Sequence, residues 1–315
     1  MLKPIIVFKI GTSSITTPNN EEVDEIFLSS IAKQISQLHQ EYNIVIVSSG
    51  AVGTGKKFIE GYTGKIGERK AAAAIGNPLL INKYAKAFEK HNIHIAQSLC
   101  ERHHFSNRNQ FLQLKDTYQE LWNHGIIPIA NENDVVSNLE LKFSDNDELA
   151  TLLAIGFQAK TLLIATSVPG VLNKKNELIP KIEKFTPAIL GYARKDKSAA
   201  GLGGMISKLT FARLATSLGI QTVIFGARSE NGIIRAIEGQ NGTICTPKKA
   251  TVNARQKWLA SGRIVYGRVK VDNGAKKALM NRSSLLSVGI TAVLRKFEKE
   301  DVFDIIDEEG WIFAV

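Results

Sequence analysis

The sequence has few cysteines and no motif rich in cysteine or histidine. Its two cysteines, Cys100 and Cys245, are far apart and have no CxxC pattern or neighbouring histidine cluster. Neither a disulfide framework nor a zinc site is therefore indicated. Five histidines on or near predicted helices and a strand edge show no spacing typical of metal ligands, and we expect them to be structural or solvated: His91, His94, His103, His104 and His124.

Long apolar runs, targeting signals and repeats are also missing. No uninterrupted apolar stretch approaches the roughly 18 residues of a membrane span, and the N-terminus lacks the layout of a signal peptide. We therefore expect a cytoplasmic protein with no membrane partner. No low-complexity segment and no internal repeat of roughly 20 to 50 residues is present, which excludes a solenoid.

What is present is the composition of a soluble globular protein. The 315 residues are 44% hydrophobic and 22% charged, enough for one large domain and a small one. Forty Lys and Arg against 30 Asp and Glu give a net charge of +10. This charge is compatible with nucleic acid, a membrane surface or an anionic small molecule as partner, and it does not choose among them.

Short apolar runs alternate with amphipathic helical stretches over most of the chain. This pattern predicts an α/β fold, a three-layer sandwich with a mostly parallel central sheet. Helical spacing appears around Phe27 and around Phe111, and Asn77-Pro78 looks like the start of another helix. The expected strands are Ile5–Ile10, Ile44–Ser48, Ile93–Gln97, Ile126–Ala130, Thr161–Thr166 and Thr222–Phe225.

The pattern changes after about residue 249. A helical stretch over residues 251–262 is followed by short β segments at 263–271, 292–297 and 302–306 with Gly-containing turns. We predict a boundary near residue 255. The expected domains are residues 1–255 and a small β-rich domain at 256–315.

Two predicted strands end in small residues with free backbone amides. Lys9 and Gly11 lie at the end of the first strand, where side chains of an open α/β sheet face the ligand. The second strand runs into the glycine-rich segment 48–55. Alone, the lysine at the end of the first strand is also compatible with a structural or solvated role, and the second loop with a plain tight turn. The recurrence of such loops on two strands favours an anion site.

Asn and Asp residues are concentrated after the strand at 126–130, in the segments 131–134 and 142–148. One of them, Asp145, suits the cap of the helix that follows. Capping does not require the others, and their carboxylates and amides favour a site for a small zwitterion.

A glycine-rich segment at 201–208 opens a further predicted helix, with Lys208 in its first turn. A surface loop is the plainer interpretation, but glycines before a helix N-terminus also form a phosphate site. The GxxxxGK[ST] pattern is absent, and so is any Ser-His-Asp or Cys-His set. The lysines, free amides and acidic segment together favour phosphoryl transfer.

These motifs resemble the amino acid kinase family over nearly the whole chain, and most closely those members that phosphorylate the γ-carboxylate of L-glutamate in proline biosynthesis. The C-terminal segments 271–275 and 283–290 resemble a PUA domain, here shortened. The kinase resemblance is carried by residues 9–13, 48–51, 131–134, 145–147 and 203–208.

The resemblance implies ATP and Mg²⁺ carried by ATP, a catalytic role for Lys9, Lys208 and Asp147, and nucleotide contacts from Lys9. It implies L-glutamate binding by Ser49, Asp134, Asn146, Lys142 and Asp145. It also implies further nucleotide contacts from Thr166, Ser167, Leu202, Gly203, Gly204, Met205, Ile206, Ser207 and Lys208.

Further partners follow from the resemblance: proline as feedback inhibitor, and a second copy of the chain in a homo-oligomer. Ser167 stands where the family usually has aspartate, which keeps open a different acid or a nucleoside monophosphate as substrate. An RNA-binding protein on a kinase-like scaffold is the other alternative. The nearly balanced charges of the PUA-like segment weaken it, because the positive excess lies in the kinase-like part.

Overall fold

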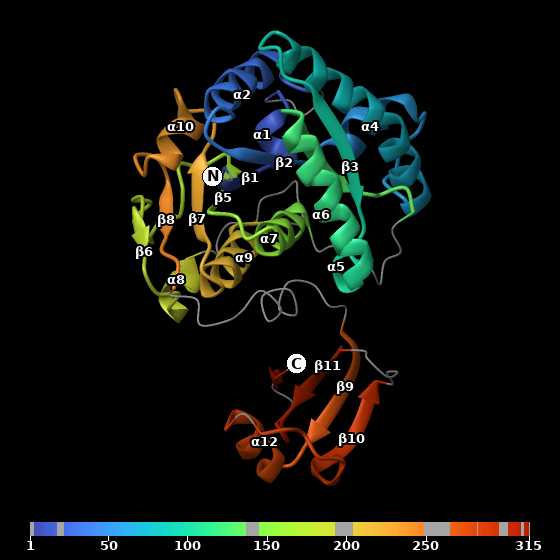
Figure 1. Cartoon of the computed structure of the whole chain (residues 1–315), viewed down its shortest axis with the longest axis vertical. Coiled ribbons are helices and arrows are strands. Elements are labelled where there is room, and N and C mark those ends of the chain that lie inside the picture. Colours follow the sequence, from blue (N-terminus) through green and yellow to red (C-terminus); the bar gives the residue numbers. More distant parts are fainter. Residues whose placement is uncertain are drawn as a thin grey trace. The chain divides into compact units, whose positions relative to one another are not determined.

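The chain divides into two compact units, Met1–Gly262, the N-terminal unit, and Arg263–Val315, the C-terminal unit. A computed structural model describes residues 3–17, 22–136, 145–192, 204–248, 265–281, 283–295, 302–309 and 312–314 (Figure 1). The predicted boundary at 255 and the predicted helix at 251–262 lie outside the described residues. Within them, no helix is both long and apolar enough to cross a membrane.

The N-terminal unit alternates strands and helices, as its apolar pattern predicts. Each expected strand overlaps an observed one. The strands are β1 (Ile5–Ile10), β2 (Asn43–Ser48), β3 (Ile95–Cys100), β4 (Ile127–Glu132), β5 (Thr161–Thr166), β6 (Lys181–Ile182), β7 (Gln221–Gly226) and β8 (Thr243–Cys245). The helices are α1 (Thr12–Ile15), α2 (Glu25–Leu38), α3 (Ala51–Gly55), η1 (Lys56–Phe58), α4 (Ile66–Glu89), α5 (His103–Ser106), α6 (Arg108–Asn123), α7 (Asn146–Gly156), α8 (Pro187–Tyr192), α9 (Met205–Ser217) and α10 (Gly232–Ile237).

The strands form an eight-stranded sheet with the order β3-β4-β2-β1-β5-β7-β8-β6. Neighbouring strands run parallel except β7 and β8. β1 is therefore a central strand between β2 and β5. Parallel strands place their carboxyl ends at one edge of the sheet, so the loops after β1, β2, β4 and β5 share that edge.

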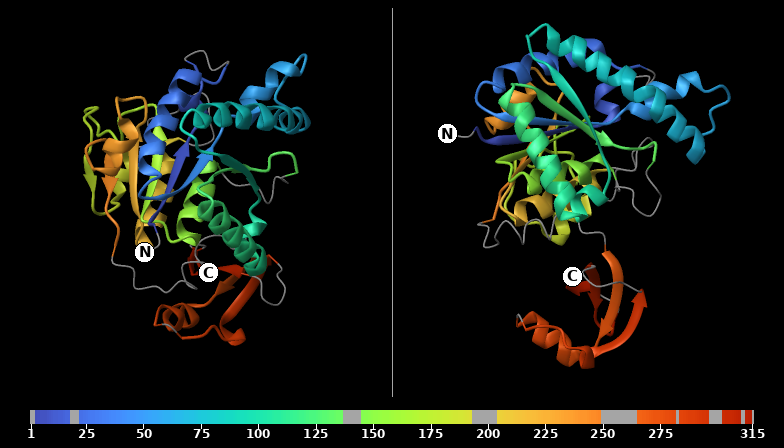
Figure 2. Two further views of the ribbon diagram at one scale, coloured as in Figure 1. Left: turned by 45° about the horizontal axis from the view of Figure 1, so that its top comes forward. Right: turned by 45° about the vertical axis from the view of Figure 1, so that its right-hand side comes forward.

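Successive residues of the central strands enter two separate hydrophobic clusters, as a sheet covered on both faces requires. In β1, Val7 packs in the cluster that includes residues of α6, α7 and α9, whereas Ile6 and Phe8 pack in the cluster that includes α2, α4 and α10. The three-layer sandwich expected from the sequence is confirmed (Figures 1 and 2).

The expectation that Asn77-Pro78 begins a helix is wrong. Helix α4 runs continuously from Ile66 to Glu89 and contains Pro78. Proline removes one N–H donor from a helix interior, which leaves the carbonyl of Ala74 without its helical partner. Both Ala74 and Pro78 lie on the exposed face of α4, where water can reach that carbonyl. Asn77 faces the opposite way and is buried.

The C-terminal unit is a small β-rich body, as its pattern of short strands and turns predicts. Its elements are β9 (Val265–Val271), α12 (Asn273–Met280), η3 (Ser287–Gly289), β10 (Ile290–Arg295), β11 (Val302–Ile306) and β12 (Ile312–Ala314). The strands form one sheet in the order β10-β9-β11-β12. Its core is centred on Val269, Val271 and Ile305.

Candidate functional site

The loop after β2 and the end of β1 are joined directly at the carboxyl edge of the sheet. The backbone N–H of Ser49 donates to the carbonyl of Ile10 over 3.1 Å. Gly50, at the start of α3, has a φ of +116°, which a side chain would disfavour. This turn brings Ser49 beside residues at the end of β4 and the start of α7.

Two lysines from distant segments meet a single carboxylate. Lys9 of β1 lies 2.6 Å from Asp147 Oδ1, and Lys208 of α9 donates to Asp147 Oδ2 over 2.9 Å. The side chain of Asp147 is 0% exposed, and those of the lysines are 6% and 10% exposed. Asp147 lies in the first turn of α7 and links the carboxyl end of β1 to the first turn of α9.

The trio carries two positive charges against one negative charge in a site largely removed from water. Burial favours the neutral form of Asp147, but Lys9 and Lys208 outweigh it and hold the pKa of this carboxyl below its ordinary value. Burial and the neighbouring Lys9 lower the pKa of Lys208, and Asp147 partly offsets them. Such a group of ammonium ions favours an incoming anion.

The N-termini of α7 and α9 lie next to each other at this site. Asp145 caps α7: one carboxylate oxygen accepts the N–H groups of Asp147 and Glu148, at 2.9 and 3.1 Å. Its other oxygen accepts from the hydroxyl of Ser207 in α9. Gly204, the N-cap of α9, has no side chain that could cap the helix, and the positive end of a helix favours a phosphate.

A cluster of side-chain amides adjoins the lysine site. Asn146 Nδ2 donates to Ser49 Oγ over 2.8 Å and to Asn131 Oδ1 over 2.9 Å. The Asn146 carbonyl oxygen is buried and has no hydrogen-bond partner among the described residues. Because a buried acceptor without a partner is costly, this oxygen marks a position where a ligand donor would be stabilised. Asn146 and Asp147 are consecutive, so the amide cluster and the lysine site are neighbours.

The other predicted site residues that the structure describes lie at the same edge of the sheet. Thr166 is the last residue of β5, and Ser167 follows it in an exposed position. Asp134 is half-buried in the turn after β4, Met205 is buried and Ile206 is exposed at the start of α9. Lys142, Leu202 and Gly203 lie outside the described residues.

Sequence reasoning missed two polar contacts that hold the loops of the site. Arg102, just after β3, forms an ion pair with the buried Glu148 of α7. Asn133 Nδ2 donates to Glu101 Oε1 over 3.0 Å. The only signal in the sequence is that charged residues follow β3 as they follow β4, and it does not identify their partners.

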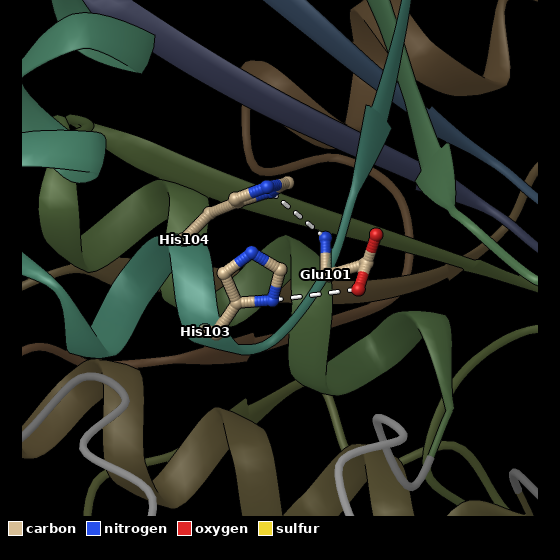
Figure 3. A group of neighbouring side chains, drawn as sticks. All are labelled: Glu101, His103 and His104. Carbon is tan, nitrogen blue, oxygen red and sulfur yellow. Dashed lines mark hydrogen bonds and ion pairs between the residues drawn. The ribbon is translucent and has the colours of Figure 1, made fainter. Parts of the chain in front are cut away.

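Glu101, His103 and His104 place potential metal ligands within 4.8 Å of one another (Figure 3). His104 Nδ1, however, accepts the backbone N–H of Glu101 over 3.0 Å. A neutral His104 then carries its proton on Nε2 and offers no free ring lone pair. Burial, followed by the neighbouring His103, lowers the pKa of His104 and favours this neutral form. We therefore assign these residues to the support of the loop after β3 and not to a metal.

Comparison with known families identifies both units. The amino acid kinase family matches residues 4–226, and the PUA domain family matches residues 267–315. A glutamate 5-kinase from Methanosarcina barkeri is 34% identical over 98% of this chain and 85% of its own length. A glutamate 5-kinase from Synechococcus elongatus is 35% identical over 97% of this chain and 86% of its own length.

Solved structures share the fold at lower sequence identity. UMP kinase from Ureaplasma parvum superposes with a TM-score of 0.52 at 15% identity, covering 78% of this chain and 100% of its own. Carbamate kinase from Giardia lamblia bound to AMP-PNP gives a TM-score of 0.55 at 17% identity, covering 78% of this chain and 99% of its own. At these identities the likeness extends to the fold alone.

Proposed function

The chain belongs to the amino acid kinase family, and we propose that it transfers the γ-phosphoryl group of ATP to the γ-carboxylate of L-glutamate. The products are ADP and L-glutamyl 5-phosphate, the first intermediate of proline biosynthesis. Relatives that carry the name glutamate 5-kinase and match nearly the whole chain support this assignment.

The observation that carries the proposal is the pairing of two subsites on consecutive residues of α7. Asp147 faces the two lysines, and Asn146 faces the amide cluster with Ser49. A phosphoryl group at the lysines and a carboxylate substrate at the amides would therefore be adjacent. Holding the two reactants together in this way supplies much of the catalysis of phosphoryl transfer.

In this arrangement Lys9 and Lys208 neutralise charge on the transferring phosphoryl group, and Asp147 holds their ammonium groups in place. A glutamate side chain has an ordinary pKa of about 4.3, so the nucleophile is already ionised at neutral pH. No general base is needed, and Asp147 would be a poor one because its pKa is lowered and both its oxygens face lysines.

We assign L-glutamate binding to Ser49, Asp134 and Asn146, and to Lys142, which lies outside the described residues. The Asn146 carbonyl oxygen, for which the described residues offer no hydrogen-bond partner, suits the ammonium group of glutamate. Asp145 contributes by capping α7, since both of its oxygens already accept hydrogen bonds within the protein.

The nucleotide lies at Lys9, at Thr166 and Ser167, and along residues 202–208 at the start of α9. The positive N-terminal end of α9, which begins after Gly204, fits its phosphates. Mg²⁺ fits as an ion carried by ATP, because both oxygens of the Asp147 carboxylate face lysines. Mg²⁺ commonly keeps waters and binds through substrate phosphates, and there it would neutralise phosphate charge.

A direct assay tests the proposal. Purified protein should release ADP from ATP only when L-glutamate is present, and hydroxylamine should trap the acyl phosphate as a hydroxamate. Turnover that does not depend on glutamate, or no turnover, would refute it. A panel of L-glutamate, L-aspartate, N-acetyl-L-glutamate and UMP separates this activity from those of other members of the family.

The PUA match favours one further candidate, RNA binding by the C-terminal unit. It predicts salt-dependent binding to structured RNA that is lost when residues 258–315 are deleted. The nearly balanced charges of this unit argue for weak binding. We further infer that the enzyme is cytoplasmic and homo-oligomeric, and that proline inhibits it by competing at the glutamate site.

A further inference from the structure

Asn77 lies in the middle of α4, far in sequence from every motif of the site, yet it contacts the amide cluster. Its side chain is buried, and its Oδ1 accepts a hydrogen bond from Asn131 Nδ2 over 3.2 Å. Asn131 in turn accepts from Asn146, which donates to Ser49. A continuous chain of three buried or half-buried amides therefore connects α4 with the proposed glutamate site.

Backbone groups fix the direction of two amides in this chain. Asn146 Nδ2 donates to the carbonyl oxygen of Ser48 over 3.4 Å, and a carbonyl oxygen can only accept. The N–H of Glu132 can only donate, and it donates to Asn131 Oδ1 over 2.9 Å. Asn131 must therefore turn its Nδ2 toward Asn77, which has to offer an acceptor. The same Asn131 oxygen accepts from Asn146, so Asn146 presents Nδ2 to it, and its own carbonyl oxygen has no hydrogen-bond partner within the part of the chain that the structure describes.

The backbone next to Asn77 packs so closely against α3 that there is no room for a side chain at Gly76. A Cβ built on Gly76 would stand 1.8 Å from the carbonyl oxygen of Ala51, and one on Gly55 would stand 1.9 Å from that of Ala72. Helices α3 and α4 thus touch backbone to backbone directly after the Ser49-Gly50 turn. Because Asn77 directly follows Gly76, this contact fixes the position of Asn77 relative to the Ser49-Gly50 turn.

We propose that Asn77 is a positioning residue that holds Asn131, the partner of the Asn146 amide, in place and thereby supports the affinity for L-glutamate. This inference rests on the proposed function. Without the Asn77 acceptor, Asn131 Nδ2 loses its buried partner, and the Asn131 amide is held only by its contacts with Glu132 and Asn146. The Asn146 amide then rests on a less firmly held partner, and its oxygen is less well placed for the substrate ammonium.

The first test compares two substitutions at Asn77 by steady-state kinetics. Asn77→Leu has a similar shape but no acceptor, and should raise the KM for L-glutamate about five- to tenfold, the scale of one neutral hydrogen bond. The KM for ATP and kcat should stay within about twofold. Asn77→Asp keeps an oxygen facing Asn131 and should return the KM for L-glutamate toward the wild-type value.

Gln34→Met is the matched structural control. Gln34 is equally buried and accepts the backbone N–H of Ile233 over 2.9 Å, joining α2 to α10 with no link to the amide chain. It should lower the melting temperature as Asn77→Leu does, without raising the KM for L-glutamate. An unchanged KM in Asn77→Leu, or an equal rise in Asn77→Asp, would overturn the proposal.

A second readout is independent of catalysis. The side-chain NH₂ signals of Asn146, assigned by their loss in Asn146→Asp, should exchange slowly with solvent in the wild-type protein and faster in Asn77→Leu. Equal exchange in both would refute the coupling. Because this measurement needs no substrate, it decides the role of Asn77 even if the wild-type protein does not phosphorylate glutamate.

Discussion

Gly76 of α4 and Ala51 of α3 are in backbone contact, close enough that a Cβ on Gly76 would lie 1.8 Å from the Ala51 carbonyl oxygen. Ala51 begins the helix that follows the Ser49-Gly50 turn. Any side chain at Gly76 must therefore separate the two helices and disturb this turn. The stability of the N-terminal unit and the shape of the proposed glutamate site depend on the same contact.

We predict that Gly76→Ala destabilises the protein by about 1–3 kcal/mol, the usual cost of overpacking, and raises the KM for L-glutamate. Thermal unfolding and steady-state kinetics check both effects. Gly67→Ala is the control, because Gly67 lies in the same helix with no atom within 4 Å of its Cβ position. It should be neutral or stabilising, since alanine favours a helix over glycine. If the two variants had the same melting temperature and the same KM for L-glutamate, the proposed role of the contact would be contradicted.

Lys208→Ala should lower kcat at least about a hundredfold, on the scale of losing one preorganised charge contact in the transition state. Asp147 would then face Lys9 alone, and the phosphoryl group would lose one of its two ammonium partners. ADP release in the presence of L-glutamate measures this change. Lys174→Ala removes an exposed lysine and should leave kcat unchanged. Near-normal turnover of Lys208→Ala would remove this residue from the mechanism.

The lowered pKa of Lys208 predicts an alkaline limit to activity. Burial and Lys9 favour loss of its proton, so kcat/KM for ATP should fall as the pH rises through a value below 10.5, the ordinary lysine pKa. Bound ATP adds negative charge and should move the limit of kcat to higher pH. Lys208→Arg stays protonated throughout this range, so its residual activity should lack the limit. A pH profile with the same limit in both proteins would assign it to another group.

Much of the fold follows from patterns that are local in sequence. The apolar run in β1 predicts a buried strand because each of its faces meets a different helix layer, as Val7 and Phe8 show. The cap of α7 by Asp145 is also local, since the acceptor and its N–H donors are within three residues. Such interactions need no knowledge of the rest of the chain.

Contacts between distant segments could not be predicted in this way. Asn77-Pro78 suits a helix start by local rules, but the packing of α4 on α3 extends the helix through both residues. The pairing of Arg102 with Glu148 joins residues 46 positions apart, and nothing near either one specifies its partner. The amide chain from Asn77 to Ser49 is long-range in the same sense. These are the contacts that position the proposed glutamate site.

Asp147→Asn should reveal how far the fold depends on the buried trio, because it leaves Lys9 and Lys208 close together without a carboxylate. At pH 7 we expect a loss of about 3 kcal/mol in the free energy of unfolding, measured with urea. The folded-state pKa of Asp147 lies below its unfolded value, so its contribution is present above about pH 4 and is lost as the pH falls through the folded pKa. The difference in the free energy of unfolding between wild type and variant should therefore narrow in acid.

Asp116→Asn is the control, because it changes an exposed carboxylate of α6. Its free energy of unfolding should match that of the wild type both at pH 7 and in acid. A gap that is absent at pH 7, or that persists unchanged in acid, would show that Asp147 does not stabilise the fold as an ionised partner of the lysines.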